Sequence, residues 1–234
     1  MENTRILVWD VPVRIVHWLL AISFTGAFLT AESERWRDVH VGLGYTVLGL
    51  LAFRLVWAFI GSRYARLRSF WFGPRAVIAY GRSLLNFRPV RYPGHNPAGS
   101  WAIYGLVTLG IITAVSGHAY FRDMGGEWLE AIHEGAANAM LALVSIHIAG
   151  VAVSSLIHRQ NLVKAMVTGY KSGRPEEGIK SPRWMAGLAL VVVVATLWTG
   201  VVEVPGLSGS TVATESSTPR GEGVAPRNVR EHGG

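Results

Sequence analysis

The chain has 234 residues, half of them apolar and only 16% charged, which excludes an ordinary soluble domain and indicates a multi-span membrane protein. It contains no cysteine, which excludes disulfides, thiolate metal sites, iron–sulfur clusters and the Cys-x-x-Cys-His attachment of c-type haem. Its net charge of +7 comes from basic residues clustered between apolar segments, so it indicates orientation in a membrane and not binding to nucleic acid.

Five segments are apolar enough to cross a bilayer core of about 30 Å, which takes roughly 20 residues. They are residues 11–30, 39–61, 99–119, 133–157 and 184–203. No small-residue cleavage site follows the first segment, so we interpret it as a retained helix and not a signal peptide. The fifth segment contains no histidine and is interpreted as a plain membrane anchor.

The connections between these segments predict the orientation of the chain. The connections after the second and fourth segments are rich in Lys and Arg, whereas the other two are acidic or nearly neutral. Because positively charged loops stay in the cytoplasm, the N-terminus is predicted inside a bacterial inner membrane and the C-terminus in the periplasm.

Two further features flank the predicted spans. A short surface helix is expected to start at Pro74, with the preceding aromatic residues Phe70, Trp71 and Phe72 at the level of the lipid headgroups. The segment from Pro205 onward is rich in Gly, Ser, Thr and Pro, and it is predicted to be a disordered tail outside the cytoplasm.

Four histidines lie in or at the ends of the predicted spans: His17, His40, His133 and His147. Metal-binding or ionisable side chains at membrane depth are costly and by default mark a functional site. His133 and His147 are 14 residues apart, so on one helix they share a face and stand about 21 Å apart along the axis.

The predicted topology pairs these histidines by depth. His17 lies early in the first span and His147 late in the fourth, so both are nearer the cytoplasm. His40 and His133 open the second and fourth spans at the outer side. Charge counting and histidine placement are independent observations, and both predict two levels with two imidazoles each. The alternative is that each histidine has only a structural role and packs against its neighbours.

Two imidazoles at each level suit a six-coordinate haem iron, which transfers electrons and has no open position for oxygen. Small residues beside the histidines would leave room for the porphyrin. These are Gly26, Gly42, Gly44, Gly49 and Gly135. Close helix packing in lipid is the alternative explanation for the same glycines.

Other polar residues carry alternatives that the sequence leaves open. Arg14 and Arg54 either pair with a haem propionate or a quinone headgroup at the inner level, or extend to the membrane surface. His118 either replaces an outer ligand or lies at the interface, and His158 contacts either a quinone or propionate or the lipid headgroups. His95, in an inner loop, and His232, in the tail, are assigned to no site.

Several short motifs resemble the bacterial cytochrome b561 type, including the cytochrome b subunit of nickel–iron hydrogenases. The motifs are Trp9 to Trp18, His40 to Gly44, Arg54 to Trp57 with Phe59 to Arg66, Gly94 to Gly99, and the stretch from His147 to Gly169. Their order and number make the resemblance specific over residues 5–175. It implies a four-helix bundle with two b-type haems and electron exchange between the quinone pool and a partner protein, with His17, His40, His133 and His147 as axial ligands.

The sequence therefore predicts an all-α integral membrane protein. Residues 1–175 are expected to form the four-span di-haem domain, residues 176–203 a fifth transmembrane helix, and residues 204–234 the outer tail. The expected cofactors are two non-covalent, bis-histidine haems b, with quinone as a further candidate. The redox partner would be a c-type cytochrome or a hydrogenase subunit. The fifth span and the tail depart from the simple four-span pattern and leave the partner open.

Two other functions are compatible with the same sequence. One is a quinone-linked oxidoreductase that acts on a small diffusible species, such as superoxide, at the outer haem. The other is a transporter or structural membrane subunit without haem, in which the histidines carry protons. Haem content separates the second function from the first, and quinone reduction without a partner protein would support the oxidoreductase.

Overall fold

The computed structural model describes residues 4–86 and 90–200, and it consists almost entirely of helices. Four helices are long and apolar enough to cross a membrane. They are α1 (Val11–Thr30), α2 (Arg37–Ile60), α4 (Pro97–Phe121) and α5 (Glu127–Ile157). The first four predicted spans are thus confirmed as helices, although α5 begins six residues before its predicted start at residue 133. His232, the tail 204–234 and the end of the predicted fifth span lie outside the described residues.

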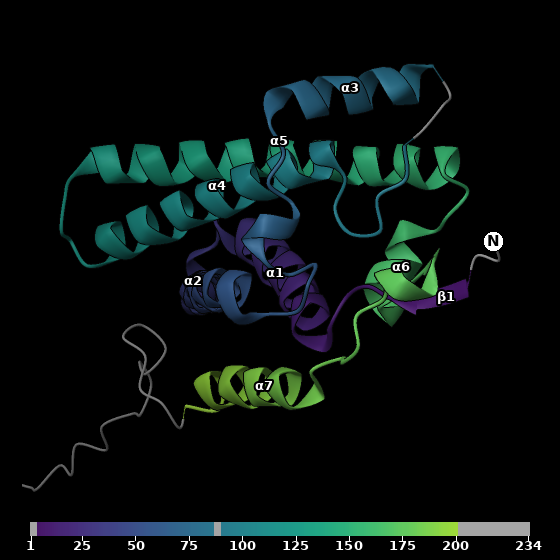
Figure 1. The fold of residues 1–234 in the computed structure, drawn as a ribbon. Helices are drawn as coiled ribbons and strands as arrows, with labels where there is room; N and C mark the ends of the chain where they lie inside the picture. The colour runs from purple at the N-terminus through teal and green to yellow at the C-terminus, as the bar shows by residue number, and fades with distance from the viewer. Residues whose placement is uncertain (1–3, 87–89, 201–234) are drawn as a thin grey trace, which may run out of the picture.

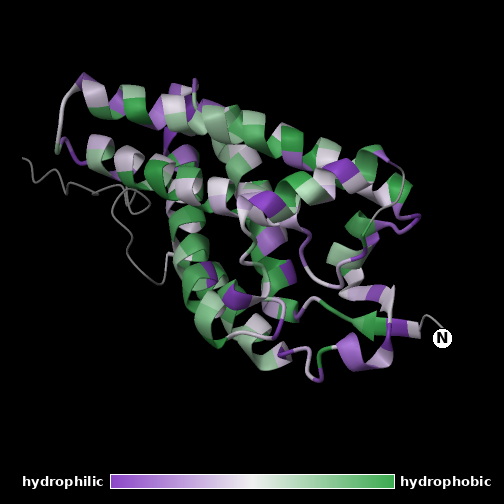
Figure 2. Ribbon diagram, turned by 45° about the horizontal axis from the view of Figure 1, so that its top comes forward, coloured by the Kyte–Doolittle hydropathy of each residue, from purple (hydrophilic) through white to green (hydrophobic). Residues whose placement is uncertain are grey.

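The long helices form two hairpins, α1 with α2 and α4 with α5, and α2 packs against α4 to join them (Figure 1). Apolar residues run along these helices and polar ones gather near their ends and in the connections (Figure 2). Large apolar side chains such as Leu29, Phe59 and Ile146 are more than 60% exposed. So much exposed apolar surface is explained by contact with lipid.

The helix starts follow from local capping chemistry. The side chains of Asp10, Asn96 and Asn161 each accept a hydrogen bond from a backbone N–H in the first turn of the helix that follows. Proline in the first turn of α1 and α4 fixes a helical φ where no intrahelical N–H bond is needed.

Asp10 has a second role besides capping α1. Its carboxylate is fully buried and also accepts hydrogen bonds from the indole N–H of Trp57 (3.1 Å) and the backbone N–H of Ser62 (3.3 Å). Because Trp57 lies in the last turn of α2 and Ser62 just beyond it, this one carboxylate fastens the start of α1 to the end of α2.

Smaller elements gather at one end of the long helices, which we call the basic end because its loops carry most of the Lys and Arg residues. They are α3 (Pro74–Leu85), α6 (Leu162–Thr168), β1 (Thr4–Leu7), β2 (Tyr170–Gly173) and the 3-10 turns Leu67–Ser69 and Pro175–Glu177. Another 3-10 turn, Glu34–Trp36, precedes α2 at the opposite end. The expected surface helix at Pro74 is confirmed as α3.

A two-stranded ribbon, which no sequence pattern predicted, ties two distant segments together. Strands β1 and β2 pair antiparallel, with Thr4 opposite Gly173 and Leu7 opposite Tyr170. Ile6 and Val8 turn into a small core with Trp9 and Tyr64, beneath the ends of the long helices. The ribbon therefore ties the N-terminus to the segment that follows α6.

The aromatic residues before α3 are placed differently from one another. Trp71 is 73% exposed, as a headgroup-level residue would be, but Phe70 is only 2% exposed. Phe70 is therefore packed inside the protein and is not an exposed aromatic residue of a membrane interface. Its ring stacks on Tyr104 of α4 and lies 4.9 Å from the ring of His95, since this loop folds under the bundle.

The last described helix, α7 (Trp184–Trp198), runs alongside α1 in the same direction. Near its start the N–H of Val11 donates to the carbonyl of Pro182, and at its end the indole of Trp198 donates to Thr46 of α2. Its 15 residues measure about 22 Å, shorter than a bilayer core of about 30 Å. The structure thus shows an apolar helix in this position but not the full span predicted for residues 184–203.

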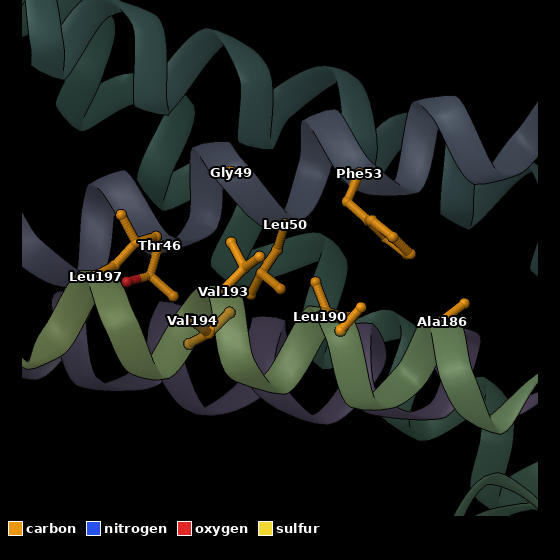
Figure 3. A pocket seen from close by; sticks show the side chains of 10 residues that line it. Thr46, Gly49, Leu50, Phe53, Ala186, Leu190, Val193, Val194 and Leu197 are labelled. Atoms are coloured by element: carbon orange, nitrogen blue, oxygen red, sulfur yellow. The ribbon is translucent and has the colours of Figure 1, made fainter. Parts of the chain in front are cut away.

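An apolar groove of about 290 Å³ separates α7 from α2 (Figure 3). Gly49 and Phe53 of α2 and Ala186 and Val193 of α7 are among the residues that line it.

Candidate functional site

Two of the predicted histidines meet near the end of the bundle opposite the basic end. His40 lies in the first turn of α2 and His133 in the second turn of α5, and their ring centroids are 6.0 Å apart. The nitrogen Nδ1 of His40 lies 2.8 Å from the carbonyl oxygen of Ala27, and Nδ1 of His133 lies 2.8 Å from that of Thr113. Because a carbonyl only accepts, each Nδ1 carries the proton, which leaves each Nε2 lone pair free to bind a metal.

The spacing of these rings suits one metal ion between them. An imidazole nitrogen lies about 2.0–2.1 Å from a bound zinc ion, and with similar bonds to iron two such rings would have centroids about 6 Å apart. Histidine ligands almost always donate their second ring N–H to a carboxylate, carbonyl or water, as both rings do here. No three His, Asp or Glu side chains of the described residues form a metal site together. A two-histidine site is complete when a porphyrin supplies the other four ligands of iron.

The packing around His133 requires a residue without a side chain on α4. A Cβ atom at Gly117 would lie 2.6 Å from Nδ1 of His133. Gly117 therefore lets α4 approach closely enough for the Thr113 carbonyl, one turn earlier, to accept from that nitrogen. Helices α2 and α5, which carry His40 and His133, are not among the closely packed helix pairs of the described chain. This separation is consistent with a planar porphyrin between them.

The second pair, His17 and His147, lies toward the basic end. The two side chains are close enough to interact electrostatically. Nδ1 of His17 is buried and has no hydrogen-bond partner in the structure. Helices α1 and α5, which carry these residues, are likewise not closely packed on each other in the described part of the chain. The pairing by depth that the sequence predicted is therefore the pairing that the fold brings together.

Both predicted arginines lie toward the basic end, and each retains unused donors. One guanidinium nitrogen of Arg14 donates to the carbonyl of Val167 at 2.6 Å, while its Nε is buried without a partner. Arg54 donates to the carbonyl of Ala65 at 3.1 Å, and its guanidinium lies 5.6 Å from the ring centre of Phe70. Both side chains thus contact backbone carbonyls at the basic end, and the two alternatives for them, a propionate or quinone contact and extension to the membrane surface, stay predictions.

His95 is a residue that the sequence analysis did not assign to the site. Its ring lies between Trp9 and Phe70, at centroid distances of 4.6 and 4.9 Å, and its Nδ1 is buried without a partner. Burial and the neighbouring cations, Arg54 first among them, hold the pKa of His95 well below its usual value. His17 and His147 also interact with it electrostatically. His95 belongs to the motif Gly94 to Gly99, which carries part of the family resemblance, but its position in a loop gave no indication that it lies near His17 and His147.

The two remaining candidate histidines have other partners. Nδ1 of His118 lies 2.9 Å from the hydroxyl of Tyr45, whereas the two rings that the structure pairs at this level are those of His40 and His133. His158 follows the last residue of α5, and its Nε2 lies 3.3 Å from the hydroxyl of Tyr80 on α3.

Comparisons with known proteins relate this chain to a family of cytochromes. The family model described as prokaryotic cytochrome b561 matches residues 8–169, a range that contains all four paired histidines and ends before α7. No solved structure matches the chain significantly.

Curated relatives carry related names. A protein of Azotobacter chroococcum named probable Ni/Fe-hydrogenase B-type cytochrome subunit is 26% identical over 224 residues, covering 75% of this chain and 93% of that protein. A protein of Rhizobium leguminosarum with the same name is 24% identical over 224 residues, covering 76% and 93%. The probable Ni/Fe-hydrogenase 1 B-type cytochrome subunit of Escherichia coli K12 is 28% identical over 142 residues, covering 50% of this chain and 60% of that protein.

Proposed function

This chain belongs to the prokaryotic cytochrome b561 family, and from that membership we propose that it is a membrane di-haem cytochrome b that transfers electrons between quinone and a redox partner. The observation that carries the proposal is the pair His40 and His133. Their rings are spaced for one metal ion, and each donates Nδ1–H to a backbone carbonyl of a neighbouring helix. These hydrogen bonds fix the tautomer and the orientation of both rings before a metal binds.

The second haem is assigned to His17 and His147, which interact electrostatically and lie on two helices, α1 and α5, that are not closely packed on each other in the described part of the chain. Helix α5 carries one ligand of each pair, 14 residues apart, so the two levels are separated by about 21 Å along its axis. When bound, haem b supplies one-electron transfer at a potential set by its ligands, its burial and the nearby charge. Arg14, Arg54 and His95 lie toward the inner level and offer donors to propionates or to a quinone headgroup.

The partner and the orientation follow from the two ends of the bundle. We place the basic end in the cytoplasm, because positively charged loops are retained there. The opposite end then faces the periplasm of a bacterial inner membrane, where a hydrogenase or a c-type cytochrome would dock. The names of the relatives support the hydrogenase. Helix α7, which we propose as a fifth span, lies beyond the family match and would adapt the bundle to its own partner.

Haem stoichiometry in single-histidine variants tests the ligand assignment. The purified protein is expected to contain two haems b per chain in a pyridine haemochrome assay. His40→Ala and His133→Ala should each remove the same haem, and His17→Ala and His147→Ala the other, with correspondingly fewer steps in a redox titration. His118→Ala and His158→Ala serve as matched controls and should retain both haems. A colourless preparation, or loss of haem in a control with retention in a ligand variant, would contradict the assignment.

A further inference from the structure

A second cavity lies outside the proposed haem sites, at the basic end of the bundle. It is a cleft of about 260 Å³ between α3, the loop before α4, the end of α5 and strand β2. Polar and basic side chains contribute much of its lining: Tyr80, Arg91, Asn96, His158, Gln160 and Lys171. None of the four paired histidines lines it.

Lys171 provides a largely buried positive charge in this cleft. Its Nζ donates to the carbonyls of Pro93 (3.0 Å) and Gly94 (3.1 Å) and lies 5.4 Å from the ring centre of Trp9. Burial lowers the pKa of Lys171 to about 8, so the ammonium form still predominates at neutral pH. Within residues 4–86 and 90–200, no carboxylate forms an ion pair with it.

The other groups that face the cleft leave its charge positive. Arg91, His158 and Lys171 all line the cleft. Burial is the largest cause that lowers the pKa of His158, and the charges of Arg91 and Lys171 lower it further. Glu177 also lines the cleft, but it forms a salt bridge with Arg174 at 2.8 Å. The cleft therefore favours an anion, and its hydroxyl and amide groups can donate hydrogen bonds to one.

The position of the cleft indicates where such an anion would come from. His158 caps the last turn of a predicted membrane span, so the cleft lies at the depth of the lipid headgroups. Large apolar side chains on the adjoining helices are exposed, including Ile78 (56%) and Leu85 (79%) of α3 and Leu156 (78%) of α5. The cationic cleft would bind an anionic headgroup, and the exposed apolar helix faces beside it would contact apolar tails, so together they fit a lipid with an anionic head. Basic pockets between helices on the cytoplasmic side of a membrane bind anionic headgroups in this way.

We propose that this cleft binds the phosphate of an anionic phospholipid, with Lys171 and Arg91 as its cationic contacts and Tyr80, Asn96 and Gln160 as hydrogen-bond donors. A free phosphate shares the chemistry of the headgroup but would gain nothing from the apolar helix faces. The bound lipid would join α3 to the end of α5 and the ribbon. This site does not depend on the haem assignment.

Native mass spectrometry of the purified, delipidated full-length protein tests the proposal. Phosphatidylglycerol should be retained in preference to phosphatidylcholine. Arg91→Gln and Lys171→Met should each weaken its retention by about fivefold, the effect of one cation near an anionic membrane surface. Arg75→Gln is the matched control, because Arg75 is an exposed arginine of α3 that does not line the cleft, and it should retain the lipid like the unmodified chain.

Three results would overturn the proposal. These are equal retention of the two lipids, equal weakening by the control, and unchanged retention in both cleft variants. A further measurement uses inorganic phosphate. If phosphate protects the protein against thermal unfolding while phosphatidylglycerol is not retained in preference to phosphatidylcholine, the cleft binds a soluble anion and not a lipid. Should Lys171→Met not fold, Arg91→Gln decides alone, since Arg91 is exposed and its side chain forms no hydrogen bond with residues 4–86 or 90–200.

Discussion

Replacement of Gly117 by alanine is the sharpest probe of the outer histidine pair. The added Cβ would lie 2.6 Å from Nδ1 and 2.7 Å from Cε1 of His133, where ordinary contact begins at 3.4 Å. The imidazole must therefore retreat by about 0.8 Å, the difference between 2.6 and 3.4 Å. A shift of that size away from Thr113 would lengthen the 2.8 Å hydrogen bond beyond the range of N–H···O bonds.

The size of the effect follows from the lost orientation of the ligand. Removal of the group that orients a metal-bound histidine typically costs 10- to 100-fold in metal affinity, or about 1.4–2.8 kcal/mol. Alanine also favours a helix over glycine by about 1 kcal/mol, so the variant should fold while holding its outer haem less tightly. We expect about 10- to 100-fold weaker binding of one haem and a shifted midpoint potential for that haem alone.

Titration of apoprotein with haem, together with a redox titration, measures both quantities. Gly81→Ala is the matched control, because Gly81 lies in α3, outside the helices that carry the paired histidines, and a methyl added there meets no neighbouring segment within 4 Å in the described structure. It should bind both haems with unchanged affinity. If Gly117→Ala also binds both haems at unmodified affinity and potential, His133 is not a ligand held by the Thr113 carbonyl.

Three further predictions concern the frame around the site. Asp10→Ala should lower the free energy of unfolding by about 3 kcal/mol or more, because it removes a helix cap and the acceptor of two buried donors. Asn161→Ala removes a helix cap alone and should cost about 1 kcal/mol in the same denaturant titration. Equal losses in the two variants would refute this role of Asp10. The pKa of Lys171 is about 8 in the folded protein and 10.5 in the unfolded chain. Between pH 8 and 10.5 the unfolded chain therefore binds more protons, and the stability of the fold should rise with pH. This rise should be absent from the thermal unfolding of Lys171→Met, and parallel pH profiles of the two proteins would contradict the prediction. Because the chain has no cysteine, a single introduced cysteine is its only thiol. A membrane-impermeant thiol reagent applied to intact cells should label Glu34→Cys but not Lys180→Cys. The reverse pattern would show that the proposed orientation is inverted.

Much of the bundle could be predicted from sequence because lipid imposes strong constraints. A span must satisfy its own backbone hydrogen bonds, so an apolar run of about 20 residues predicts a helix directly. The depth pairing of His17 with His147 and His40 with His133 followed from counting residues along such helices. The start of α5 was missed by six residues, because Glu127 and Glu130 interrupt the apolar residues that precede His133.

Contacts between distant segments could not be predicted in the same way. The pairing of β1 with β2 joins residues more than 160 positions apart, and neither four-residue strand has a pattern of its own. The inward turn of Phe70 and the position of His95 beside the inner pair depend on how the loop around α3 folds back under the helices.

The sequence by itself determined the membrane class, the long helices and the two levels of imidazole pairs, because helix geometry and hydropathy act over neighbouring residues. Only the tertiary structure decided which atoms orient the rings, that Gly117 must lack a side chain, and that Lys171 stands in a cationic cleft. These properties arise where separate helices and loops approach one another, and no local pattern records the distance between them.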